Sequence, residues 1–201
     1  MSRSGSDASN DPAGRPLPWE RLSEELITHC PVFDFVSRRM RHPRRGTEAD
    51  FYVLKSRNWV NVLPITPEGE VVMVRQYRFG IEALSWEIPG GVMDAGEEPV
   101  AAGLRELEEE TGFVPRSSRL LGSISPNPAI LDNRCYFVLA DHVTPTGSLA
   151  WDEHEELETR LFAMDDVYAM AQRGEIAHSL VLNALFLFYP EWQRRQARRR
   201  S

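Results

Sequence analysis

Cysteine is scarce in this sequence, which has only two such residues among 201. Cys30 and Cys135 lie far apart and form no CxxC pair. This spacing argues against a disulfide framework and against a cysteine-rich zinc site, so we expect two reduced thiols. The N-terminal residues also contain no apolar run of the kind that a signal peptide needs. Together these absences predict a cytoplasmic protein.

Long apolar runs and an excess of positive charge are also missing. The most apolar stretch, LVLNALFLFY at positions 180–189, includes Asn183 and is too short to cross a bilayer. It predicts a buried helix instead. The net charge of -7 gives no general attraction to nucleic acid or to an anionic membrane, so we expect neither as a partner.

The sequence does contain enough apolar material for one folded domain with an additional arm. The hydrophobic fraction is 42%, and the aromatic fraction of 9% argues against disorder along the whole chain. Composition divides the chain into a disordered tail, an N-terminal arm, a main domain and a basic C-terminal tail, at residues 1–16, 17–50, 51–190 and 191–201. Within the arm, residues 19–26 could form a short helix, and residues 31–42 have a rough strand-like alternation.

Hydrophobic periodicity predicts both strands and helices in the main domain. Strands are expected at residues 50–56, 59–66, 71–78, 120–125, 135–143 and 158–164. Helices are expected within residues 97–112, 164–174 and 178–192. The first helix has Pro99 in its first turn and Gly112 just past its end, and the turn signal PEGE at positions 67–70 predicts a hairpin. This order predicts an α+β domain with a largely antiparallel or mixed sheet.

The segment GGVMDAGEEPVAAGLRELEEETGF, at positions 90–113, carries more acid than a helix normally tolerates. Four acids occupy the five positions after Arg105, and no Lys or Arg follows it in the predicted helix. Like charges three or four positions apart destabilise a helix by about 0.2–0.5 kcal/mol per pair, and negative charge is unfavourable at a helix C-terminus. A compensating positive charge is therefore expected.

At about 100° per residue, three of these acids share one helix face, apart from the apolar stripe: Glu106, Glu109 and Glu110. Glu108 faces away from them. A solvated acidic face is the ordinary interpretation of such a run. The lack of neighbouring bases favours a metal site, because grouped carboxylates suit a hard ion such as Mg2+. The Gly90 carbonyl could add a neutral ligand, and Arg105 would hold Glu97 in a fixed orientation.

At these residues the sequence resembles the signature of the Nudix hydrolase family. The matching positions are Gly91, Glu97, Arg105, Glu106, Leu107, Glu109, Glu110, Gly112 and Phe113. The resemblance implies a Nudix-type α/β/α sandwich that hydrolyses a nucleoside diphosphate linked to another group. It implies Mg2+, with Mn2+ as an alternative, and a catalytic role for Glu110 and Arg105. The implied metal ligands are Gly90, Glu106, Glu109 and Glu110, with Glu97 as an inner or outer partner.

The preceding segment, VRQYRFGIEALSWEIPGG, resembles the ADP-ribose pyrophosphatase and nucleoside diphosphate sugar hydrolase branch. In that branch Arg78 and Glu87 would lie near the substrate, and Pro128 would occupy the position of a marker proline. Arg57 and Trp59 are further candidates for substrate binding. The segment SPNPAILDNRCYFVLA departs from the usual ADP-ribose pyrophosphatase version, which widens the expected substrates to nucleoside diphosphate sugars.

Two other segments resemble functional parts of this branch. The loop WDEHEELE resembles one that supplies a glutamate as general base, and Glu153 and Glu155 are its best matches. The segment before residue 50 resembles strands that pair with a second subunit, which implies a homodimer. Its basic residues at positions 38–45 could offer an arginine to a phosphate, although a solvated hairpin is the simpler expectation. His178 is expected to be structural.

The leading hypothesis is Mg2+-dependent hydrolysis of the pyrophosphate bond of ADP-ribose or ADP-glucose type substrates. The products would be a nucleoside monophosphate and a sugar phosphate. Two alternatives stay open. One is a hydrolase of dinucleoside polyphosphates, modified nucleotides or capped RNA 5′ ends, and the other is a non-catalytic sensor that binds ADP-ribose.

Overall fold

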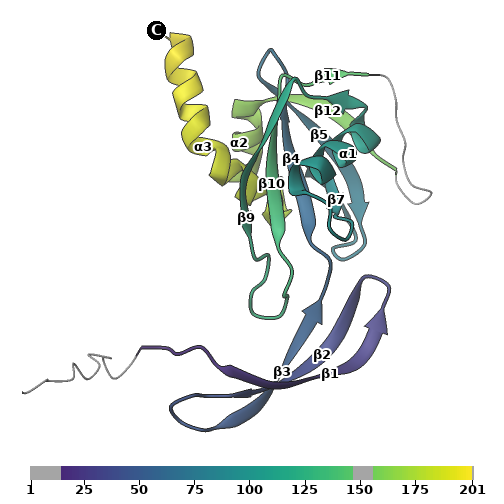
Figure 1. The fold of residues 1–201 in the computed structure, drawn as a ribbon. Helices are drawn as coiled ribbons and strands as arrows, with labels where there is room; N and C mark the ends of the chain where they lie inside the picture. The colour runs from purple at the N-terminus through teal and green to yellow at the C-terminus, as the bar shows by residue number, and fades with distance from the viewer. Residues whose placement is uncertain (1–14, 147–155, 201) are drawn as a thin grey trace, which may run out of the picture. The chain divides into compact units, whose positions relative to one another are not determined.

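The computed structural model describes residues 15–146 and 156–200 (Figure 1). The fold divides into two units, Met1–Leu54 and Lys55–Ser201. Each unit has a β-sheet of its own, and only the second contains helices among the described residues.

The first unit is a three-stranded sheet in the order β1-β2-β3. Its strands are β1 (Glu20–Cys30), β2 (Phe33–Arg41) and β3 (Glu48–Lys55). β1 pairs antiparallel with β2 along nearly its whole length, so the short helix considered for residues 19–26 is wrong. Pairing with a neighbouring strand satisfies the backbone groups of β1 and overrides the weak local preference for a helix.

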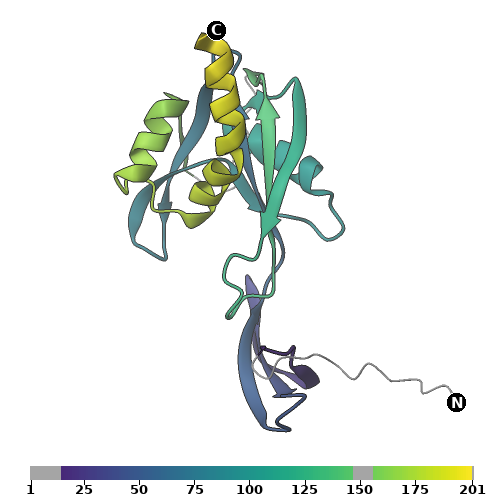
Figure 2. The same cartoon turned by 90° about the vertical axis from the view of Figure 1, so that its left-hand side faces the viewer.

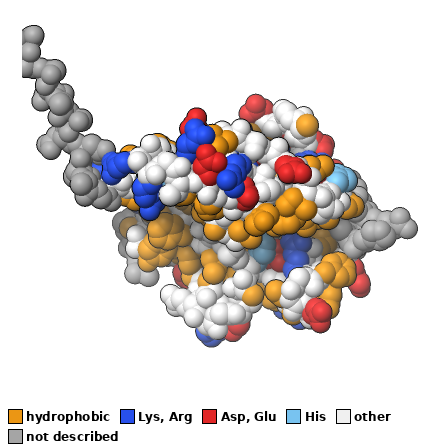
Figure 3. Space-filling view, turned by 90° about the horizontal axis from the view of Figure 1, so that it is seen from below, with side chains coloured by type: hydrophobic (Ala, Val, Ile, Leu, Met, Phe, Trp, Pro, Cys, Tyr) orange, Lys and Arg blue, Asp and Glu red, His pale blue; other side chains and the backbone are white. Residues whose placement is uncertain are grey.

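The basic segment at positions 38–45 contacts acids of the same sheet. Arg38 Nε lies 2.7 Å from the Glu24 carboxylate, and an Arg41 nitrogen lies 3.0 Å from Glu48. Apolar side chains of this unit nevertheless remain exposed, including Leu26 at 57% and Val32 at 72%. In the view of Figure 3, hydrophobic side chains are exposed among charged side chains of both signs.

The second unit contains a seven-stranded mixed sheet. Its main order is β12-β5-β4-β10-β9, and β6 pairs with β5 while β7 pairs with β4. These strands are β4 (Trp59–Ile65), β5 (Glu70–Arg78), β6 (Ala83–Glu87), β7 (Gly90–Val92), β9 (Ser117–Ile124), β10 (Cys135–Asp141) and β12 (Glu158–Ala163). A small sheet joins β8 (Phe113–Val114) to β11 (Thr144–Pro145). β10 runs parallel to β4, and β4 pairs antiparallel with β5, as predicted for the hairpin.

Both faces of this sheet are covered by helices (Figures 1 and 2). The helices are α1 (Pro99–Thr111), α2 (Met164–Gln172) and α3 (Ser179–Arg200). The core on the α1 side includes Val60, Val62, Val72, Leu107 and Val138. The core on the side of α2 and α3 includes Leu63, Met73, Phe137, Val181 and Phe188. Neighbouring residues of one strand therefore belong to different layers, which is the period of two that a strand buried on both faces requires. The predicted α+β class with a mixed sheet is confirmed.

Helix α1 has the ends that the sequence predicted. Pro99 occupies its first turn, where the missing N–H has no intrahelical partner to lose. Gly112 adopts a left-handed conformation, with φ of 68°, and its N–H donates to the Glu108 carbonyl. The buried Leu107 faces the sheet, and the missing side chain of Gly103 lets the helix approach the sheet closely. The acids of α1 are thereby fixed relative to the strands.

Helix α3 continues through Pro190 to Arg200, so the segment expected to be a basic tail from residue 191 is helical up to Arg200. Arg195 accounts for part of this extension, because it donates to the Asp141 carboxylate at 3.1 and 2.6 Å and also to Glu191. The buried Trp192 adds an apolar contact on the same segment. Among the helices of the described residues, none has the length and apolar character that crossing a membrane requires.

The tight contact between α1 and the sheet leads to a stability prediction. A Cβ atom at Gly103 would lie 3.0 Å from Val62 Cγ2 and 3.1 Å from Val138 Cγ2, so Gly103→Leu has no space for its side chain. We expect it to lower the free energy of unfolding by about 1–3 kcal/mol, as measured by urea denaturation. Ala101→Leu, on the exposed side of the same helix, should change it by less than about 0.5 kcal/mol. Equal stability of the two variants would contradict this packing.

Candidate active site

Arg105 lies at the centre of a group of carboxylates from α1 and from the segment just before it. Its Nε and Nη2 donate to the two oxygens of Glu97, each at 3.1 Å, which confirms the predicted contact between these residues. Its Nη1 donates to Glu106 at 2.9 Å and to Glu109 at 3.0 Å. One guanidinium therefore holds three carboxylates, and with Glu110 these acids form what we call the acid cluster: Glu97, Glu106, Glu109 and Glu110.

The ion pair with Arg105 keeps Glu97 ionised. The pKa of Glu97 is lowered, mainly by the hydrogen bonds from Arg105 and then by the backbone N–H of Asp94, which donates at 3.0 Å. The same contact with Glu97 raises the pKa of Arg105, and Glu106 and Glu109 act in the same direction. Both partners are therefore charged at neutral pH.

Strand β7 lies directly against the acid cluster. The buried Glu110 accepts a hydrogen bond of 3.1 Å from the backbone N–H of Gly90. A Cβ atom at Gly91 would lie 2.5 Å from a carboxylate oxygen of Glu106, and one at Gly90 would lie 2.2 Å from the Val60 carbonyl oxygen. Only glycine fits at Gly90, where the close atoms include backbone, whereas a side chain at Gly91 would displace the Glu106 carboxylate. The Pro-Gly-Gly segment thus brings backbone close to the acids.

The donor chemistry of the acid cluster fits a divalent cation. Three of its carboxylates contact the Arg105 guanidinium and the fourth, Glu110, accepts from the Gly90 N–H, so four negative charges and one positive charge leave a formal charge of -3. Carboxylate oxygens are the ligands that hard cations prefer. Among the described residues no three His, Cys, Asp or Glu side chains form a ready metal-binding group. Glu106 and Glu109 instead share one nitrogen of Arg105, so a bound cation would compete with this arginine for their oxygens.

A second ion pair joins the ends of β5 and β6. Arg78 Nε and Nη2 donate to the two oxygens of Glu87 at 2.8 and 2.7 Å. Glu87 is fully buried, whereas the Arg78 side chain is 40% exposed. Of the two residues predicted to lie near the substrate, Arg78 therefore has exposed atoms that could touch it. Glu87 could contribute only through Arg78.

The remaining predicted substrate residues are not brought into the acid cluster by any described contact. Trp59 is partly buried and packs against the core on the side of α2 and α3, which does not suit a base-stacking role. Arg57 is 63% exposed and lies 3.6 Å from Asp94. Pro128 is exposed in the connection between β9 and β10. The predicted general bases, Glu153 and Glu155, lie outside the described residues.

One residue that the sequence marked only as structural lies beside the second ion pair. His178 Nδ1 is 3.6 Å from a carboxylate oxygen of Glu87. Burial lowers the pKa of His178, Glu87 partly opposes this effect, and Arg78 adds to it. The only sequence signal was its position at the start of a predicted helix, which gives no information about the contact with β6.

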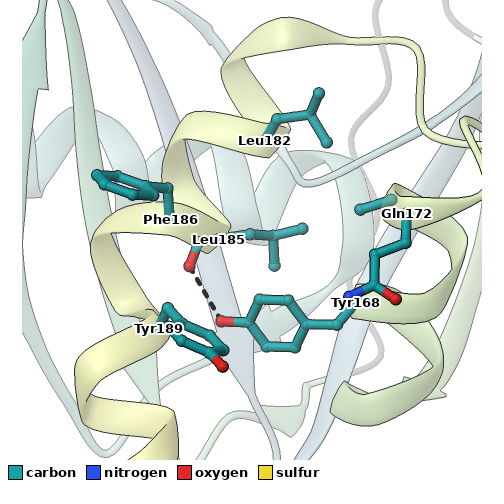
Figure 4. Close-up of a pocket in the computed structure, with 7 residues that line it drawn as sticks. Tyr168, Gln172, Leu182, Leu185, Phe186 and Tyr189 are labelled. Atoms are coloured by element: carbon teal, nitrogen blue, oxygen red, sulfur yellow. Dashed lines mark hydrogen bonds between the residues drawn. The ribbon is translucent and has the colours of Figure 1, made fainter.

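An apolar cavity of about 300 Å3 lies between α2 and α3 (Figure 4). It is lined by Tyr168, Ala171, Gln172, Leu182, Leu185, Phe186 and Tyr189. Tyr168 Oη donates to the Leu185 carbonyl at 3.0 Å at its edge. Helices α2 and α3 cover the face of the sheet opposite α1, so this cavity is separate from the acid cluster.

Comparisons with known proteins give a family match and several relatives. A family model described as NUDIX domain matches residues 55–185. The ADP-ribose pyrophosphatase of Bacillus subtilis (strain 168) is 28% identical over 163 residues, which cover 81% of this chain and 88% of that protein. The ADP compounds hydrolase NudE of Escherichia coli (strain K12) is 28% identical over 143 residues, covering 71% and 75%. A crystal structure of an ADP compounds hydrolase superposes with a TM-score of 0.79 at 24% identity, over 90% of this chain and 97% of that one, and shows that the two share a fold.

The pairing of Arg105 with Glu97 leads to a prediction about pH. Because the pKa of Glu97 is lowered in the folded state, the stability it contributes is present above its unfolded pKa of about 4.3 and is lost as pH falls through the folded pKa. Arg105→Gln removes the cause of that shift. We therefore expect the wild type to exceed Arg105→Gln in free energy of unfolding above pH 5, and the difference to shrink below pH 4, in urea denaturation with EDTA. A difference that does not vary with pH would contradict this account.

Proposed function

Because this chain belongs to the Nudix family, we propose that it hydrolyses the pyrophosphate bond of nucleoside diphosphate sugars, giving a nucleoside monophosphate and a sugar phosphate. The predicted family and enzyme class, a Nudix pyrophosphatase, are confirmed. Substrates of the ADP-ribose and ADP-glucose type are supported by relatives that are named for ADP-ribose and ADP compounds. The observation that carries the chemistry is the acid cluster, with its excess of negative charge beside the backbone of β7.

Nudix hydrolases generally use divalent metal ions, and for this chain we propose Mg2+, with Mn2+ as an alternative. The proposed ligands are Glu106, Glu109, Glu110 and the Gly90 carbonyl, with Glu97 in a supporting position. A cation bound there would neutralise the charge of a diphosphate and lower the pKa of a bound water. The Gly90 N–H holds Glu110 in place, and Arg105 holds Glu97.

Side chains outside the acid cluster would bind the substrate phosphate and accept a proton. The exposed part of the Arg78 guanidinium would bind a phosphate oxygen of the substrate, because a planar guanidinium matches phosphate geometry. Glu153 or Glu155, in the sequence before β12, would accept the proton of the attacking water. Trp59 is left out of the proposed site because it packs into the core.

A pair of variants on one helix tests the proposal. With saturating Mg2+ and a panel of nucleoside diphosphate sugars, we expect Glu110→Gln to lower kcat by about a thousand-fold or more while the protein stays folded, because the variant loses a metal-binding carboxylate. Glu108→Gln is the matched control, since its side chain is exposed and faces away from the acid cluster. It should keep kcat within about two-fold.

The same assay separates the competing functions. Near-normal turnover by Glu110→Gln would remove the role assigned to this residue. A second outcome is faster release of product from dinucleoside polyphosphates, modified nucleotides or capped RNA than from any nucleoside diphosphate sugar. That result would replace nucleoside diphosphate sugars as the proposed substrates. Tight binding of ADP-ribose without turnover in either Mg2+ or Mn2+ would identify a sensor instead of an enzyme.

We further propose that the first unit forms a homodimer interface. A three-stranded sheet that exposes apolar side chains gains stability by burying them against a second copy. Leu26, Ile27, Val32 and Tyr52 are exposed by 57%, 48%, 72% and 57%. Light scattering at micromolar concentration should give twice the chain mass, and a monomer would contradict the proposal. The cytoplasmic location and the lack of nucleic acid or membrane partners stay predictions from the sequence.

A further inference from the structure

Glu87 is a fully buried carboxylate whose neighbours include two basic side chains. Both of its oxygens accept hydrogen bonds from Arg78, as described above, and Nη2 of Arg78 donates to Oε2 at 2.7 Å. The same Oε2 is the atom that His178 Nδ1 approaches at 3.6 Å. Two donors from distant parts of the chain therefore face one oxygen, and only one of them is within hydrogen-bond distance.

Capping of α3, the helix that His178 precedes, does not explain why its side chain lies beside Glu87. Its carbonyl accepts hydrogen bonds from Val181 and Leu182, at 3.1 and 3.4 Å, so it is the N-cap residue of α3. Side chains that cap such a position are usually Ser, Thr, Asp or Asn. The imidazole of His178 instead reaches β6, and its buried Nδ1 has no hydrogen-bond partner among the described residues.

His178 can act as a hydrogen-bond donor in its neutral form. Burial lowers its pKa, so the ring carries one proton at neutral pH. A neutral imidazole donates through one nitrogen and accepts through the other. Because Nδ1 faces a carboxylate oxygen, which can only accept, the favourable tautomer has its proton on Nδ1.

Arg78 lies on the side of the sheet where the acid cluster lies. Val72 of the same strand belongs to the core under α1, and an even number of positions separates it from Arg78, so both side chains leave β5 on the α1 side. Glu87, at the end of β6, is followed after two residues by Gly90, whose N–H binds Glu110.

We propose that His178 is a positioning residue that takes over as donor to Glu87 when Arg78 turns toward the diphosphate of the substrate. The inference rests on the proposed function. Without a second donor, Oε2 of Glu87 would lose its hydrogen bond in a place that water does not reach, and this loss would oppose the movement of Arg78. A small shift of the imidazole toward Glu87 brings Nδ1 within hydrogen-bond distance and lowers that cost. His178 thereby favours substrate binding without touching the substrate.

Kinetics of three variants test the proposal. His178→Phe keeps a ring but removes the donor, so we expect KM to rise about ten-fold while kcat stays within about two-fold. His178→Asn places an N–H near the position of Nδ1 and should restore KM to within about three-fold of the wild type. Ser179→Ala is the matched control, because it alters the exposed neighbouring residue at the start of α3 and should leave KM unchanged.

Two kinetic results would overturn the proposal. One is an unchanged KM for His178→Phe. The other is an equal rise in KM for His178→Phe and His178→Asn together with a lower Tm for both, which would mean that the ring only packs.

A measurement that needs no turnover separates this proposal from the proposed function. In 15N-histidine-labelled protein at pH 7, NMR should show the His178 proton on Nδ1, with the signal assigned by its loss in His178→Phe. A proton on Nε2 would overturn the inference even if the enzyme hydrolyses nucleoside diphosphate sugars. If the protein hydrolyses none of these sugars, the proposed function fails, whereas a proton on Nδ1 would still support the contact between His178 and Glu87.

Discussion

The contact of one arginine with three carboxylates is the interaction on which the site depends. Arg105 holds Glu106 and Glu109 on α1, where the local sequence favours their separation, together with Glu97 from the segment before the helix. It supplies only one positive charge, so negative charge remains in excess around it. That excess is unfavourable for the isolated protein and favourable for a protein that binds divalent cations. The crowding of acids in the helix sequence is therefore explained by the cation-dependent chemistry proposed for a pyrophosphatase.

The fold serves this cluster by holding backbone close to it on two sides. Gly103 allows α1 to lie against the valines of β4 and β10, and Gly91 leaves room for the carboxylate of Glu106. Gly90 donates its N–H to Glu110, which fixes the last acid of the cluster to β7. Rigid supports on both sides suit a site that must place several carboxylates within about 0.5 Å of a productive geometry.

The sequence predicted correctly the features that depend on residues close together in the chain. Pro99 and Gly112 marked the ends of α1, because each has an intrinsic conformational preference, and the helical repeat placed Glu106, Glu109 and Glu110 on one face. Interactions between distant segments were not predictable in this way. The strand at β1 depends on its pairing with β2, and the extension of α3 is held by the contact of Arg195 with Asp141. The burial of Glu87 and its neighbour His178 likewise required the folded chain.

The acid cluster carries more negative charge than Arg105 neutralises, and a divalent cation bound there would supply the missing positive charge. Binding of a cation to the folded state alone must stabilise it in proportion to the logarithm of the cation concentration above its Kd. The most direct measurement is the Tm of the wild type and of Glu106→Gln as MgCl2 is titrated at constant ionic strength. The account predicts a rise in Tm for the wild type that is much smaller for Glu106→Gln. A wild-type Tm that does not change with Mg2+ or Mn2+ would contradict it.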